Sequence, residues 1–168
     1  MEKIEEIVHV IPLGHEIDRA VKPFDRYKVN KIYLLAVTET FGKYSQEMIE
    51  KQKYYLEIVM NELKERGIAV EQRNIDMFDM LEVIKNVANL IVEEKSRGNR
   101  VYVNISAAGR LTSAATTLVA MAHGVKAYYV SADEYSESKE DKMKHGLSIC
   151  RKSPQVQLLE TFRLQLPK

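Results

Sequence analysis

The fold is decided by residues 101–124, which have the sequence VYVNISAAGRLTSAATTLVAMAHG. This stretch begins as an apolar, β-branched run, breaks at small residues, and continues as a helix built largely of small side chains. A strand-to-helix turn of this kind allows backbone N–H groups to approach an anion closely. It predicts a phosphate-bearing ligand, although small residues at such a turn also serve close packing without any ligand.

Strand-like and helix-like segments alternate on either side of this stretch. We expect strands over 5–12, 31–37, 68–74, 100–105 and 125–130, and helices over 45–66 and along the apolar positions from 77 to 91. Gly67, Gly98 and Gly124 each end a helix just before a strand. Five strands joined by helical crossovers predict a three-layer α/β/α Rossmann-like sandwich, with a mostly parallel sheet in the order 3-2-1-4-5.

The last quarter of the chain departs from this alternation. We expect residues 1–134 to form the Rossmann-like core, and residues 135–168 to form a polar connection followed by a C-terminal β-hairpin. The polar part, 135–145, favours a surface loop or a short exposed helix that could act as a lid. The hairpin would pair 147–150 with 156–166, and its stripe of Phe162, Leu164 and Leu166 indicates a dimer contact or the start of a linker.

Composition excludes several classes of function. The 25 basic and 24 acidic residues leave a net charge of +1, so the chain has no global positive field for holding DNA. The single cysteine, Cys150, cannot form an internal disulfide, no signal segment is visible, and no apolar stretch approaches the ~18 residues of a membrane span, so we expect a cytoplasmic protein. Scattered histidines without ligand spacing predict no metal site. The Gly-x-Gly-x-x-Gly and P-loop motifs are absent, which argues against a dinucleotide-dependent dehydrogenase and an NTPase and predicts no cofactor.

The predicted strand order places a ligand crevice between the first and fourth strands, where the loops after Leu13 and Ile105 should face one another. Arg110 suits a phosphate because its guanidinium can hold two oxygens at once, although a surface ion pair is the alternative. Glu16 and Asp18 could equally complement a helix N-terminus, and polar loop residues after the second strand could contact a base or ribose or be ordinary loop. The residues expected to bind the ligand are Leu13, Gly14, His15, Asp18, Thr38, Glu39, Asn104, Ser106, Ala107, Ala108, Gly109 and Arg110.

Two motifs together resemble a known family. Residues 12–19, PLGHEIDR, and residues 104–110, NISAAGR, are similar to those of the CARF (CRISPR-associated Rossmann fold) domain, especially in archaeal transcription regulators with a C-terminal winged helix. The resemblance covers roughly residues 4–131. Family members usually carry Asn-Ile-Thr-Gly-Gly-Thr-Lys at the second motif. Here serine replaces threonine, alanines replace two glycines, glycine replaces the next threonine, and Arg110 retains the cation.

The resemblance implies a homodimer that binds a cyclic oligoadenylate across its twofold axis and regulates an attached or partner effector. DNA would be reached only through a winged-helix domain that this chain lacks. One alternative is a metal-independent ring nuclease, in which Arg110 stabilises charge on a phosphate and His15 or Ser106 aids proton transfer or positioning. Another is a different nucleotide-binding Rossmann-like protein, on fold analogy alone.

Overall fold

Five parallel strands form the centre of the sheet, in the order β3-β2-β1-β4-β5. They are β1 (Ile7–Pro12), β2 (Lys31–Ala36), β3 (Ala69–Asn74), β4 (Arg100–Asn104) and β5 (Lys126–Val130). The coordinates are a computed structural model that describes residues 2–152 and 154–159. The predicted strand order is confirmed, and a sixth strand, β8 (Val156–Leu159), runs antiparallel along β5.

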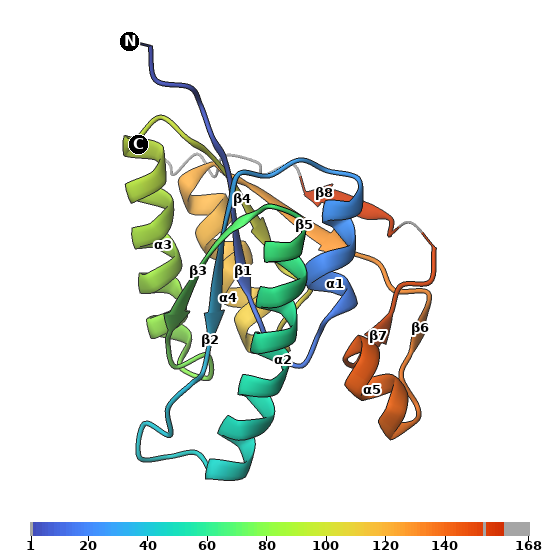
Figure 1. Ribbon diagram of the computed structural model, residues 1–168. Helices are drawn as coiled ribbons and strands as arrows, with labels where there is room; N and C mark the ends of the chain where they lie inside the picture. The colour runs from blue at the N-terminus through green and yellow to red at the C-terminus, as the bar shows by residue number, and fades with distance from the viewer. Residues whose placement is uncertain (1, 153, 160–168) are drawn as a thin grey trace.

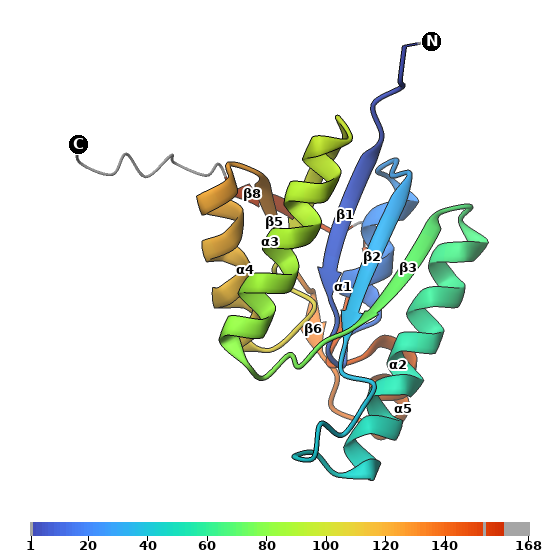
Figure 2. The same ribbon diagram turned by 90° about the vertical axis from the view of Figure 1, so that its left-hand side faces the viewer.

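Helices cover both faces of this sheet (Figure 1, Figure 2). One face carries α3 (Met80–Ser96) and α4 (Arg110–His123), and the other carries α1 (Asp18–Val21), a short 3-10 helix at Lys22–Asp25, and α2 (Gln46–Glu65). The parallel strands point downward in Figure 1, so their carboxyl ends lie at the lower edge of the sheet. The three-layer α/β/α class expected from the sequence is therefore confirmed.

The core has two halves because the central strands are buried on both faces. In β1, Val8 and Val10 pack toward α3 and α4, whereas Ile11 packs toward α1 and α2. Tyr33 and Leu34 of β2 divide between the two halves in the same way. Burying each such aliphatic side chain contributes about 1.5–3 kcal/mol, so the continuous apolar strands hold the layers together.

The helix boundaries follow from local capping. Ser45 accepts a hydrogen bond from the backbone N–H of Met48 at the start of α2, and Asp79 accepts two at the start of α3. At the end of α4, Gly124 has a φ of +63°, a left-handed conformation that favours glycine. Within the described residues, no helix is long and apolar enough to cross a membrane.

A C-terminal antiparallel strand pair is present, but its partners differ from those expected. Residues of β7 (Ser148–Ile149) pair with β6 (Glu134–Tyr135), and β8 pairs with β5 instead of with 147–150. The edge of β5 has unpaired backbone groups that an antiparallel strand satisfies, which accounts for the position of β8. A short helix, α5 (Lys139–His145), forms in the polar connection, while the stripe of Phe162, Leu164 and Leu166 lies outside the described residues.

Candidate ligand-binding site

The two predicted loops meet at the carboxyl ends of β1 and β4. The backbone N–H of Gly14 donates to the carbonyl of Ala107 over 2.8 Å. A Cβ atom on Gly14 would lie 3.4 Å from Cα of Ala108, so the two backbones are in van der Waals contact. The two loops therefore meet at the topological switch point, where parallel α/β sheets bind their ligands.

Arg110 is exposed and is the first residue of α4. Gly109 precedes it at the N-cap position, and no side chain caps this helix. The first N–H groups of α4 and its positive dipole end therefore point outward beside the guanidinium. Arg110 forms no ion pair with another described residue. This arrangement can bind an anionic oxygen through both backbone and side-chain donors.

Asn104 and Ser106 are buried and hold the second loop in shape. The Asn104 Oδ1 atom accepts from the Ser106 backbone N–H over 2.8 Å and from its hydroxyl over 2.7 Å. The Ser106 Oγ atom accepts in turn from the backbone N–H of Val130 over 3.0 Å, and Asn104 Nδ2 donates to the carbonyl of Arg19 over 3.2 Å. These bonds fix the backbone of the second loop, which includes Ala107 and Ala108. Direct contact of the Asn104 and Ser106 side chains with a ligand stays a prediction.

His15 is the partly exposed side chain of the first loop. Its ring stacks on Tyr55 of α2, with ring centres 5.0 Å apart and planes inclined by 23°. Burial and the nearby Lys51 ammonium lower the pKa of His15, which favours the neutral ring near pH 7. The loop is also fixed by Gln52, whose amide donates to the carbonyl of Leu13 over 3.0 Å and to that of Gly14 over 3.2 Å.

The two carboxylates of the first loop are buried and face residues 145–150. Asp18, expected to bind the ligand, places Oδ2 at 2.9 Å from both the backbone N–H of Cys150 and Nδ1 of His145. Glu16 accepts from the Ser148 hydroxyl and backbone N–H, and burial raises its pKa to about 7. The structure thus uses both carboxylates to join distant parts of the chain.

The sequence of the chain matches a known protein family. A family model described as HFX_2341_N:-like, N-terminal, matches residues 7–135 and includes both loops. The chain belongs to this family. It is also 23% identical to uncharacterized protein MJ1513 of Methanocaldococcus jannaschii, over 100% of this chain and 54% of that protein. The chain therefore spans about half the length of this curated relative.

Solved structures share the fold of this HFX_2341_N-like chain. One is a type III CRISPR defence DNA nuclease activated by cyclic oligoadenylate, with a TM-score of 0.58 and 16% identity over 79% of this chain and 20% of the nuclease. Another is Can2 from Sulfobacillus thermosulfidooxidans in complex with cyclic tetra-adenylate, with a TM-score of 0.56 and 10% identity over 75% of this chain and 32% of Can2. The HFX_2341_N-like chain thus has a CARF-like fold.

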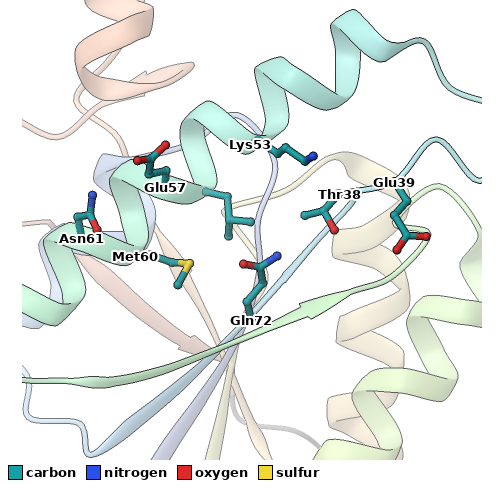
Figure 3. A pocket seen from close by; sticks show the side chains of 8 residues that line it. Thr38, Glu39, Lys53, Glu57, Met60, Asn61 and Gln72 are labelled. Carbon is teal, nitrogen blue, oxygen red and sulfur yellow. The ribbon is translucent and has the colours of Figure 1, made fainter.

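Thr38 and Glu39 lie in a different cleft from Gly14 and Arg110. Figure 3 shows side chains from α2 facing the carboxyl end of β2 and the edge strand β3 across a cavity of about 610 Å³. None of its lining residues comes from the β1–α1 or β4–α4 loop; they are Thr38, Glu39, Lys53, Leu56, Glu57, Met60, Asn61 and Gln72. A ligand role for Thr38 and Glu39 stays a prediction, and this cleft is the competing location for a ligand.

Sequence reasoning missed Gln52 as a residue of the site. The signal was available, because Gln52 interrupts the apolar stripe of α2 that includes Ile49, Leu56 and Val59. A buried polar side chain in such a stripe needs a hydrogen-bond partner, which here is the backbone of the first loop. The described residues contain no group of three or more His, Cys, Asp or Glu side chains placed to hold a metal ion.

Proposed function

We propose that this chain is a CARF-type sensor domain that binds a cyclic oligoadenylate between the β1–α1 and β4–α4 loops. The observation that carries the proposal is the contact of Gly14 with Ala107, which brings the uncapped start of α4 and Arg110 beside the first loop. A solved neighbour bound to cyclic tetra-adenylate and another activated by cyclic oligoadenylate support this ligand class. Binding would regulate an attached or partner effector, which we expect to act in CRISPR-linked transcription.

The ligand's phosphodiesters match the donors at the crevice. Each nucleotide of a cyclic oligoadenylate carries one negative charge, which the guanidinium of Arg110 and the first N–H groups of α4 can share. The partly exposed ring of His15, already stacked on Tyr55, offers a flat surface for a base. The absence of a side chain at Gly14 lets the first loop pack directly against the backbone of Ala107 and Ala108, which brings His15 close to the start of α4.

A homodimer would complete the site. Apolar side chains are exposed around the start of α3 and along α4: Phe78, Leu81, Leu111 and Leu118. Leu111 and Leu118 are seven residues apart and lie on one face of α4. The Thr112 hydroxyl donates to the carbonyl of Met77 over 2.9 Å, so the starts of both helices are neighbours. A second copy packed there would supply a second Arg110 to a twofold-symmetric ring.

Calorimetric titration tests the proposal with cyclic tetra-adenylate, cyclic hexa-adenylate and linear tetra-adenylate as ligands. We expect one ring per two chains, and we expect Arg110→Ala to weaken binding by about 10- to 100-fold, because it removes a charged hydrogen-bond donor. The matched control is Arg26→Ala, since the Arg26 side chain is also exposed and its guanidinium lies 6.0 Å from the centre of the Tyr27 ring. It should leave the affinity unchanged.

Two other outcomes change the conclusion. Linear products in the titrated mixture, detected by chromatography, would favour the ring nuclease, with Arg110, Ser106 and His15 as the residues to substitute next. Failure of the native chain to bind either ring would remove the cyclic oligoadenylate proposal.

A further inference from the structure

A strap formed by residues 134–150 lies against the first ligand loop. It contains β6, α5 and β7, and Figure 1 shows it beside α1 at the lower edge of the molecule. Its two ends are joined by the β6–β7 pair and by Asp133, whose carboxylate accepts from the backbone N–H groups of Arg151 and Lys152 over 2.6 and 3.1 Å. The strap is therefore a closed segment with its own anchoring point.

The strap and the loop dock backbone to backbone. The carbonyl of His15 accepts from the N–H of Leu147 over 2.9 Å, and the N–H of Ile17 donates to the carbonyl of His145 over 3.1 Å. Gly146 lies between these bonds with a φ of +84° and faces Glu16 in an isolated β-bridge. A Cβ atom at Gly146 would be only 2.6–2.7 Å from backbone atoms of the loop, so this contact requires glycine.

Two buried carboxylates, Glu16 and Asp18, strengthen this contact between the strap and the first loop. The Ser148 hydroxyl donates to Glu16 Oε1 over 2.9 Å, and the backbone N–H of Cys150 donates to Asp18 Oδ2 over 2.9 Å. The Nδ1 atom of His145 lies 2.9 Å from the same Asp18 oxygen. Because a buried carboxylate without hydrogen bonds is costly, the loop and the strap each satisfy the other's polar groups.

Helix α2 contacts both the strap and the first loop. The Tyr55 hydroxyl donates to the carbonyl of Lys142 in the strap over 3.1 Å, while the Tyr55 ring stacks on His15. Tyr54 donates to the carbonyl of Met143 over 3.0 Å. Tyr55 thus links the His15 ring to the strap, while the His15 carbonyl bonds to Leu147 of the strap directly.

We propose that the strap is the positioning element of the first ligand loop. It holds Gly14 and His15 in the conformation that binds the ligand, and ligand binding in turn stabilises the docked strap. The coupling of the strap to the ligand rests on the proposed function, whereas the positioning of the loop by the strap concerns the ligand-free chain alone. Since coupling between two binding events is reciprocal, a loss of strap docking and a loss of ligand affinity must occur together.

Amide hydrogen exchange on the ligand-free chain tests whether the strap positions the first loop. Gly146→Ala should undock the strap and speed exchange at Ile17 by tenfold or more, and Ser148→Ala should speed it about fivefold through the loss of one hydrogen bond to Glu16. The control is Ser96→Ala, because the exposed Ser96 hydroxyl donates to the carbonyl of Glu93 in its own helix and bonds to no other described residue. Exchange in β4 reports whether each variant keeps its fold, and unchanged exchange at Ile17 in both folded strap variants would overturn the proposal.

Titration of the same variants with cyclic tetra-adenylate tests the coupling between strap docking and ligand binding. The affinity of each variant should fall in proportion to the fraction of its chains in which the strap is docked, so Gly146→Ala, which undocks the strap, should bind more weakly than the native chain, and the ligand should slow exchange at Leu147 of the native chain. Equal affinity in the native chain and in a folded Gly146→Ala variant whose strap is undocked would overturn the coupling. If the native chain binds no ring, the proposed function fails, and the exchange of the ligand-free variants alone decides whether the strap positions the loop.

Discussion

Replacing Glu16 by glutamine should remove a large part of the chain's pH-dependent stability. Burial raises the pKa of Glu16 from 4.5 to about 7, with smaller opposing effects of the Ser148 hydrogen bonds and the Arg19 charge and a small raising effect of Asp18. The folded chain therefore keeps a proton that the unfolded chain loses between pH 4.5 and about 7. The contribution of Glu16 to the free energy of unfolding therefore falls as the pH rises through this window.

The size of this effect follows from the shift. A difference of roughly 2.5 pKa units corresponds to about 3 kcal/mol at 1.36 kcal/mol per unit, and most of it is lost between pH 5 and 8. Glutamine cannot lose this proton, yet its amide oxygen can still accept from Ser148. Glu16→Gln should therefore gain about 2–3 kcal/mol relative to the native chain on going from pH 5 to pH 8.

Urea unfolding of both chains at pH 5, 6, 7 and 8 measures this difference. The contact between His145 and Asp18 is present in both chains, so the comparison isolates the change at Glu16. Glu65→Gln serves as the matched control because Glu65 is exposed, and its curve should run parallel to the native one. If the free energy of unfolding of Glu16→Gln runs parallel to that of the native chain from pH 5 to 8, the pKa of Glu16 is not raised by burial and the prediction is wrong.

Two further predictions concern buried polar groups in the strands of the sheet. Asn104→Ala should lower the free energy of unfolding by about 2–4 kcal/mol, because it leaves the backbone N–H and the hydroxyl of Ser106 without their acceptor. Chemical denaturation measures this loss, and a value below ~1 kcal/mol would contradict the prediction. The imidazole of His9, whose pKa is lowered to about 3 by burial, should stay neutral from pH 5 to 8, so its NMR ring signals should not move in that range, and a titration near pH 6 would contradict its burial against Tyr128.

The sheet could be predicted because each of its signals is local. Helices that end at Gly67, Gly98 and Gly124 before short apolar runs leave few topologies other than a right-handed parallel sheet. The meeting of the loops at Gly14 and Ala107 then follows from strand order alone, without knowledge of any side chain.

The strap could not be predicted because its signals are distant and ambiguous. Glu16 and Asp18 follow a strand at the start of a helix, where a ligand role or a helix-terminus role accounts equally well for acidic residues. Their hydrogen-bond partners Ser148 and Cys150 are 132 residues away, and only the folded chain brings them together. The pairing of β8 with β5 was missed for the same reason, since alternation in a C-terminal strand does not specify its partner.

A crystal structure of the chain with cyclic tetra-adenylate would show where the ring binds and whether two copies share it. The ring should lie over Gly14 and the start of α4 on a twofold axis between two copies, with a phosphate oxygen within hydrogen-bond distance of Arg110. A ring bound in the cleft beside Thr38 and Glu39, or held by one chain without contact to Arg110, would contradict the account.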